Sequence, residues 1–288
     1  MSVESLAQDA FSPLRGRLFG IAYRMLGSRA DADDIVQEAW LRWRGADRAT
    51  IGTPEAWLVT VTTRLSIDRL RHAQTEREHY TGPWLPEPIV EATVPPAENA
   101  LEQASDVSLA FLTLLERLAP EERAAYLLRE VFDYAFAEVA EVVGKSEAAC
   151  RQMVSRARKR VQAERPRFDV PIAAHMKLLE KFMIAARSGQ LDDLRALFAE
   201  DALLLADGGG KVESVLRPVR GADRLARLYH VVARRLGARA DMRIAIVNGE
   251  PGVVRTLDGL IDTVISVVTD GERITALYSV RNPEKLRA

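Results

Sequence analysis

The sequence is poor in the residues that build disulfide frameworks and metal sites. Its 288 residues include one cysteine, Cys150, and four histidines, so no intramolecular disulfide can form and no Cys/His ligand pattern is present. It also lacks a run of about 18 apolar residues, and its start has no basic segment followed by an apolar one. We therefore expect a soluble cytoplasmic protein with no membrane span, metal or cofactor.

The composition is that of an ordinary globular protein. Hydrophobic residues make up 48% and charged residues 28% of the chain, and its length allows more than one domain. The net charge of -1 conceals a local asymmetry, because acids gather in residues 31–38 and bases in residues 151–167. Local charge is therefore the better guide to partners.

The segment Ser28 to Trp43 has strong helix signals. Gly27 can end the preceding helix, Ser28 can cap the new one, and Asp31 completes a capping-box pattern. Apolar residues fall on one side at helical spacing. The other side is an acidic face with an apolar residue in it, which suits docking on a basic surface as well as simple exposure to solvent: Asp34, Gln37, Glu38 and Leu41.

Two further helices flank this segment, over residues 11–26 and 56–72. Pro54 stands where the second of them can begin, and its second half is basic, with Arg64, Arg69 and Arg71. We assign these three helices to a first domain, residues 8–79.

Residues 80–105 are predicted to be a linker. Five prolines between positions 83 and 96 exclude a continuous helix or a central strand. Trp84, Leu85 and Ile89 are costly to leave in water, so the WLPEP segment at 84–88 is a candidate for docking on another part of the chain.

Residues 106–165 are predicted to form a helix-turn-helix domain. The helical pattern starts at about Leu101, breaks at Pro120, and continues through a short helix at 136–143 that ends at Gly144. Ser146 then caps a helix with an apolar face and a polar, basic face. Its bases, opposed locally only by Glu164, suit phosphate contact: Arg151, Arg156, Arg158, Lys159, Arg160, Arg165 and Arg167.

Residues 172–284 are predicted to form an α+β domain. Helical segments at 172–187, 191–198 and 222–236 accompany short β-rich runs separated by Asn248-Gly249, Asp258-Gly259 and Asp270-Gly271. These dipeptides favour β-hairpins. We expect a curved antiparallel sheet packed against helices.

The motifs DADDIVQEAWLRW at 31–43 and EVAEVVGKSEAACRQMVSRARKRV at 138–161 resemble those of extracytoplasmic-function (ECF) RNA polymerase sigma factors. WLPEP at 84–88, DGGGK at 207–211 and NPEKL at 282–286 resemble the subgroup with a fused carboxy-terminal SnoaL-like domain, where the last motif is nearer NPDKL. The resemblance implies two all-α sigma domains followed by an α+β cone, and a transcription initiation factor rather than an enzyme.

The resemblance also implies roles for particular residues. Asp34, Gln37, Glu38 and Leu41 would dock on the clamp helices of the largest subunit of core RNA polymerase. The implied contacts to promoter DNA are Arg64, Arg69 and Arg71 near the minus-ten element, and Ser146, Arg151, Gln152, Ser155, Arg156 and Lys159 near the minus-thirty-five element. The implied regulatory contacts of the fused domain are Trp84, Leu85, Pro86, Asp207, Lys211, Asn282 and Pro283.

Two other classes of function stay open at this stage. SnoaL-like folds include cyclases and isomerases with an apolar ligand and a catalytic carboxylate, so the last domain could be an enzyme or a sensor of a small-molecule ligand fused to a DNA-binding module. Asp207, Asp223, Asp241 and Asp262 are the available acids, although each is more readily a solvated or turn carboxylate. A one-component regulator without polymerase would leave the acidic helix unexplained.

Overall fold

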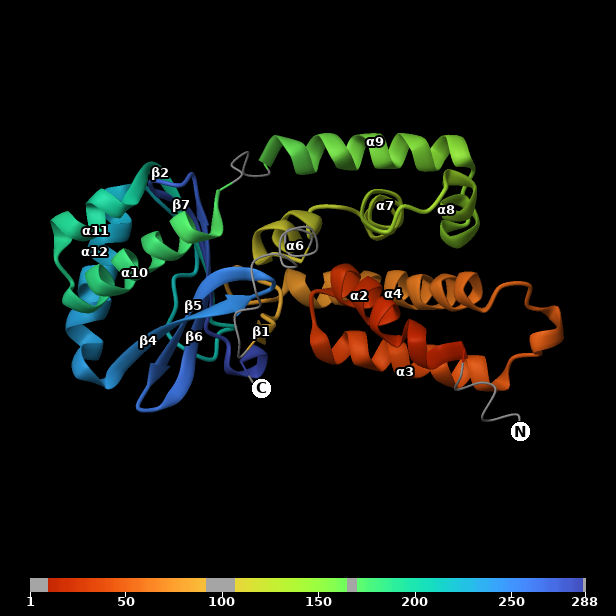
Figure 1. The fold of residues 1–288 in the computed structure, drawn as a ribbon, viewed down its shortest axis with the longest axis horizontal. Helices are drawn as coiled ribbons and strands as arrows, with labels where there is room; N and C mark the ends of the chain where they lie inside the picture. The colour runs from red at the N-terminus through yellow and green to blue at the C-terminus, as the bar shows by residue number, and fades with distance from the viewer. Residues whose placement is uncertain (1–9, 92–106, 165–169, 287–288) are drawn as a thin grey trace. The chain divides into compact units, whose positions relative to one another are not determined.

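The computed structural model describes residues 10–91, 107–164 and 170–286, which form two compact units (Figure 1). The first unit combines Met1–Glu78 with Leu114–Glu164, and the second combines His79–Thr113 with Arg165–Ala288. The chain therefore leaves the first unit after Glu78, contributes the segment His79–Thr113 to the second unit, and returns to the first unit at Leu114.

The first half of the first unit is a set of packed helices. They are η1 (Ser12–Leu14), α2 (Arg15–Leu26), α3 (Arg29–Gly45), η2 (Arg48–Thr50) and α4 (Pro54–Glu78). α2 ends at Gly27, whose φ of 68° is readily adopted by glycine. Ser28 caps α3 as predicted, with its hydroxyl accepting from the Asp31 amide at 3.2 Å.

The capping box predicted at the start of α3 is incomplete. The Asp31 carboxylate accepts a hydrogen bond from Arg69 Nε on α4 at 2.9 Å, which ties the two helices together. The apolar faces of the three long helices meet in a core that includes Leu18, Ile21, Met25, Ile35, Val36, Trp43, Leu58 and Leu70.

The second half of the first unit contains the predicted helix-turn-helix. It comprises the end of α6 (Leu109–Leu115), α7 (Pro120–Tyr126), η3 (Leu127–Val131), α8 (Phe136–Val143) and α9 (Glu147–Glu164). Gly144 ends α8 with a φ of 71°, and the Ser146 hydroxyl caps α9 by accepting from the Ala149 amide. The helix start expected near Leu101 lies outside the described residues.

The second unit is built on a seven-stranded sheet. Its strands are β1 (Val90–Glu91), β2 (Phe198–Asp207), β3 (Val219–Arg220), β4 (Ala240–Val247), β5 (Glu250–Leu257), β6 (Leu260–Thr269) and β7 (Ile274–Val280), in the order β1-β4-β5-β6-β7-β2-β3. The three predicted hairpin dipeptides connect β4 to β5, β5 to β6, and β6 to β7. The sheet is mixed rather than purely antiparallel, because β2 pairs with β7 in parallel.

Each face of this sheet has its own core. On one face lie α10 (Ile172–Ser188), α11 (Leu191–Leu197) and α12 (Ala222–Leu236) (Figure 1), around Phe182, Phe198 and Tyr229. The other face packs against Leu85, Leu109 and Ala110, which come from the segment that joins the two halves of the first unit. Two short turns, η4 (Gly237–Arg239) and η5 (Pro283–Lys285), complete the unit.

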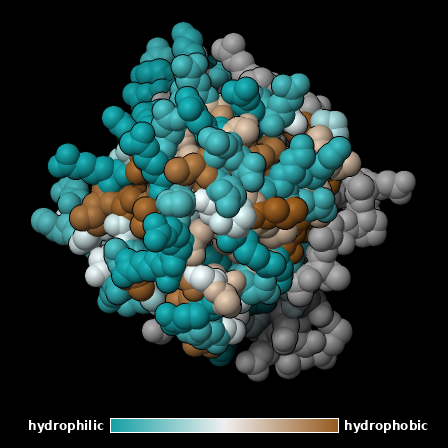
Figure 2. Space-filling view, turned by 90° about the vertical axis from the view of Figure 1, so that its left-hand side faces the viewer, coloured by the Kyte–Doolittle hydropathy of each residue, from teal (hydrophilic) through white to brown (hydrophobic). Residues whose placement is uncertain are grey.

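Some large hydrophobic side chains of the second unit reach the surface, including Ile184, Leu191 and Val231. On the face drawn in Figure 2, hydrophobic residues form small patches separated by hydrophilic ones. Scattered apolar residues of this kind are normal on protein surfaces and identify no partner. Among the described helices, none has both the length and the apolarity needed to cross a bilayer.

Candidate functional site

The predicted polymerase-docking face lies along one side of α3. Asp34, Gln37 and Leu41 are exposed, and Leu41 is 50% exposed although it is apolar. Glu38 is half-buried and accepts from Arg42 Nε at 2.9 Å. The buried side of the helix carries Ile35, Val36, Ala39 and Trp43, so this helix presents an acidic outer face with a central leucine.

The arginines predicted to contact the minus-ten region are engaged within the first unit. The Arg64 guanidinium donates from Nε to the Val142 carbonyl at 3.0 Å and from Nη2 to the Glu141 carbonyl at 2.7 Å, both on α8. Arg69 pairs with Asp31, and Arg71 pairs with Asp68 and with Glu121 at the start of α7. In this arrangement the three arginines of α4 form hydrogen bonds and ion pairs with other residues of the same unit.

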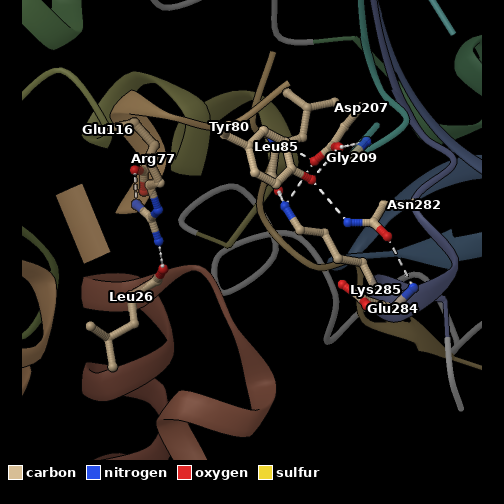
Figure 3. A network of polar contacts seen from close by, with 10 residues as sticks. All are labelled: Leu26, Arg77, Tyr80, Leu85, Glu116, Asp207, Gly209, Asn282, Glu284 and Lys285. Carbon is tan, nitrogen blue, oxygen red and sulfur yellow. Dashed lines mark hydrogen bonds and ion pairs between the residues drawn. The ribbon is translucent and has the colours of Figure 1, made fainter. Parts of the chain in front are cut away.

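A second set of contacts, centred on Glu116 in the connection between α6 and α7, was missed by sequence reasoning. Arg77 donates to the Glu116 carboxylate and, at 2.7 Å, to the Leu26 carbonyl (Figure 3). Arg123 on α7 donates to Glu116 and, at 2.9 Å, to the Arg24 carbonyl, and its side chain is 1% exposed. The two arginines share the one carboxylate of Glu116, and the hydrogen bonds to backbone carbonyls further offset the cost of burying them. The network joins the two halves of the first unit.

The predicted reader helix α9 has a partly free outer face. Gln152, Ser155 and Lys159 are exposed, while Ser146 serves as the helix cap. Arg151 pairs with Glu147 and lies over the Phe136 ring, with 4.4 Å between its guanidinium carbon and the ring centroid. Packing against the aromatic ring orients this guanidinium.

The expectation that only Glu164 opposes the bases of α9 is wrong. Arg156 and Arg160 both pair with Glu122 of α7, and Arg158 forms two hydrogen bonds with Glu130. Local sequence could not reveal these partners, because they lie 28 to 38 positions away. Arg165 and Arg167 are outside the described residues.

Asp207 is the centre of a buried polar network in the second unit (Figure 3). Its carboxylate, which is fully buried, accepts from the Tyr80 hydroxyl at 2.6 Å, the Leu85 amide at 2.9 Å and the Gly209 amide at 3.0 Å. Lys285 Nζ lies 2.8 Å from the same carboxylate. The expectation of a solvated carboxylate is therefore wrong, since four donors surround the buried Asp207 side chain. The expectation of a turn acid is confirmed, because one of these donors is the Gly209 amide, two residues further along the chain.

The three short motifs meet at this network. Lys285 of NPEKL also donates to the Leu85 carbonyl at 2.6 Å and lies 4.0 Å from the centroid of the Trp84 ring. Asn282 donates to the Tyr80 hydroxyl at 2.9 Å. Burial, together with the hydrogen bond to Asp207, raises the pKa of Tyr80, which keeps its hydroxyl a donor.

Steric crowding explains why a glycine is required in the middle of the DGGGK motif. Gly209 has a φ of +59°, and a Cβ there would collide with the Asn282 amide and lie 3.0 Å from the Tyr80 hydroxyl. At this position a side chain would both strain the backbone and displace the network. The Gly209 amide also donates a hydrogen bond to the Asp207 carboxylate, so this glycine is part of the network itself.

The remaining residues of the three short motifs lie beside the Asp207 network. Leu85 and Pro86 are buried, Pro283 opens η5 after the Asn282 cap, and Lys211 pairs with Glu284 at 2.9 Å on the surface. Sequence reasoning selected Asn282 and Pro283 from NPEKL but missed Lys285, and it also missed Tyr80, just before the WLPEP segment. All these contacts lie inside one compact unit, so they do not cross a unit boundary.

The other candidate carboxylates do not form a catalytic site. Asp223 and Asp241 are exposed and pair with Arg195 and Arg187. Burial alone would raise the pKa of Asp262, but hydrogen bonds from Thr263 and Arg255 hold it at about 2. Within the described part of the chain, no three His, Cys, Asp or Glu side chains are grouped to hold a metal ion.

The fold and these surfaces define a class of protein. A helical domain with an acidic face, a helix-turn-helix domain and a carboxy-terminal helix-and-sheet domain form a sigma-type transcription initiation factor. Comparison with known families agrees, since residues 10–76 match Sigma-70 region 2 and residues 108–161 match Sigma-70 region 4.

Full-length relatives give the family. The ECF RNA polymerase sigma factor SigJ of Mycobacterium tuberculosis is 41% identical, over 96% of this chain and 91% of that protein. Probable ECF RNA polymerase sigma factor SigI of the same species is 30% identical, over 99% and 97%. The crystal structure of SigJ superposes with a TM-score of 0.75 at 37% identity, covering 99% of this chain and 98% of the other.

The chain belongs to the ECF RNA polymerase sigma factors. It therefore directs transcription initiation, and its family consists of initiation factors rather than enzymes.

Proposed function

We propose that this sigma factor binds the clamp helices of core RNA polymerase through Asp34, Gln37, Glu38 and Leu41. The exposed acidic side chains of α3 complement a basic surface, and Leu41 can be buried by a partner. Promoter DNA is then contacted by α4 and by the outer face of α9, where Gln152, Ser155 and Lys159 are exposed.

In this proposal, DNA binding requires a rearrangement of the first unit. Arg64 and Arg71 of α4 are hydrogen-bonded to α8 and α7. A phosphate can replace these partners only if α4 moves away from the helix-turn-helix. The initiation-competent state is thus one in which regions 2 and 4 have separated.

The carboxy-terminal domain regulates this change in cis, according to the same proposal. The observation that carries it is the capture of the Leu85 amide by Asp207, because Leu85 belongs to the segment between regions 2 and 4. That segment is held at both ends, by Tyr80 and Leu85 near its start and by Leu109 and Ala110 near its end. A domain that holds the connection can limit how the two regions rearrange.

Run-off transcription with core polymerase tests this role. The full chain, a chain ending at Val280, a chain ending at Arg167 and the Trp84→Ala variant should differ from one another severalfold. The Val280 truncation removes Lys285 and Asn282 but leaves the sheet, whereas the Arg167 truncation removes Asp207 as well. Leu260→Ala is the matched control, since Leu260 is 77% exposed and should retain full activity. Equal activity in all four chains would contradict the regulatory role.

A further inference from the structure

A cavity of ≈ 420 Å³ lies between α12 and one face of the sheet in the second unit. Its floor is apolar and buried, with Leu204 at 3% and Ile265 at 1% exposure, and its edge carries exposed residues such as Val231. The volume is at the small end of the range of about 300–1,000 Å³ that is typical of ligand pockets. The shape suits a small molecule whose apolar part is deeply buried.

Polar groups without partners line this cavity. Ser214 Oγ and Arg281 Nε are buried there and have no hydrogen-bond partner among the described residues. Tyr229 and Ser279, which each carry a hydroxyl, also line it, and each residue is 6% exposed. Buried polar groups are normally satisfied, so a cavity that gathers such donors fits a ligand that accepts hydrogen bonds.

Positive charges outnumber negative ones in the polar cluster at this cavity. Arg255 and Arg281 both pair with the same carboxylate, that of Asp262, and both arginines line the cavity. Arg255 is only 5% exposed. Two guanidinium groups facing one carboxylate leave one positive charge in excess, and a charge removed from water is stabilised by a counter-charge.

The exposed charges at the edge do not remove this excess. Glu213 pairs with Arg235, and Asp258 pairs with Arg239, so each acid near the mouth already has its own arginine. The excess therefore lies on Arg255, which is buried, and Arg281, whose side chain is 24% exposed.

We propose that this cavity binds a small monocarboxylate with an apolar body. The carboxylate pairs with Arg255 and Arg281 and accepts from the Tyr229 hydroxyl, while the apolar body packs on Leu204, Leu228 and Ile265. The site is one of binding only, since Asp262 is committed to the two arginines. It would make the carboxy-terminal domain a sensor of an organic acid, and the binding itself does not depend on the proposed regulatory role.

Isothermal titration calorimetry on the full chain tests the proposal with decanoate as the probe. Decanoate should bind at least tenfold more tightly than 1-decanol, which has the same apolar chain without the charge, and decylamine should not bind. Equal affinity for decanoate and decanol, or no binding of decanoate at millimolar concentration, would overturn it. This comparison uses the wild-type chain and so does not depend on any variant folding.

Three variants then locate the site. Ile265→Trp should fill the floor and weaken decanoate binding more than tenfold, and Tyr229→Phe should weaken it about threefold or more by removing one donor. Tyr278→Phe is the control, because Tyr278 is similarly buried but packs on the opposite face of the sheet; its affinity should stay within twofold of wild type. Circular dichroism confirms folding. If Tyr229→Phe and Tyr278→Phe behave alike, or a folded Ile265→Trp binds like wild type, the cavity is not the site.

Discussion

The Asp207 carboxylate accepts a hydrogen bond from the Leu85 amide at 2.9 Å, across 122 positions of sequence. The same carboxylate is 2.8 Å from Lys285 Nζ, which in turn donates to the Leu85 carbonyl. One acid and one base from the carboxy-terminal domain thus hold both backbone polar groups of a single linker residue. Because the side chain of Leu85 is also fully buried, the linker segment is folded into this domain.

Asp207→Asn should destabilise the carboxy-terminal domain by roughly 3 kcal/mol, because the change leaves the Lys285 charge buried without its counter-charge. Urea unfolding followed by circular dichroism measures the loss. Asp241→Asn is the control, since its ion pair with Arg187 is exposed and such pairs contribute about 1 kcal/mol or less. A loss of the same small size in both variants would show that the Asp207 network does not hold the domain together.

The double variant Asp34→Arg with Glu38→Arg should lose binding to core polymerase, because two reversed charges would face a basic surface at a cost of several kcal/mol. Pull-down of core enzyme measures the loss. Asp192→Arg with Asp193→Arg makes the same change of net charge on the exposed side of α11 and should bind normally. Retention of the core enzyme by the α3 variant would refute the docking face.

Gln152→Ala should change which minus-thirty-five sequences support transcription, whereas Lys159→Ala should weaken all promoters to a similar extent. The reason is that base contacts discriminate between sequences and phosphate contacts do not. Arg151→Ala should resemble Gln152→Ala, since the Phe136 ring orients this guanidinium. A library of promoter variants distinguishes the two patterns, and a uniform loss in all three proteins would contradict the division of roles.

Stability of the carboxy-terminal domain should fall as the pH drops from about 6.5 to about 4. Burial lowers the pKa of His175 from 6.5 to about 4, partly offset by a hydrogen bond with the Val267 backbone. Between these two values the unfolded chain binds the proton and the folded chain does not, so acid favours unfolding by up to about 3 kcal/mol.

Urea midpoints measured across this pH range test the histidine effect. His175→Leu should flatten the pH dependence, whereas His79→Gln, a change at an exposed residue, should keep the wild-type slope. An unchanged slope in His175→Leu would exclude His175 as the cause.

Local patterns in the sequence determined most of the fold. Gly27 and Gly144 end helices, Ser28 and Ser146 cap helices, and the three hairpin dipeptides connect strands where they were predicted, because each effect depends on neighbouring backbone atoms alone. The exposed acidic face of α3 followed from helical periodicity in the same way. The motifs also identified the family, since they are contiguous stretches of chain.

Tertiary structure alone decided where the charged side chains found their partners. Arg64 ends on the carbonyls of α8, Arg156 on Glu122 and Asp207 on Leu85 and Lys285. The parallel pairing of β2 with β7 likewise could not be predicted from the sequence, because strand order is a relationship between distant segments. An ionised group that is removed from water needs a partner of opposite charge or a hydrogen-bonding partner. Which residue becomes that partner is determined only when packing brings remote segments of the chain together.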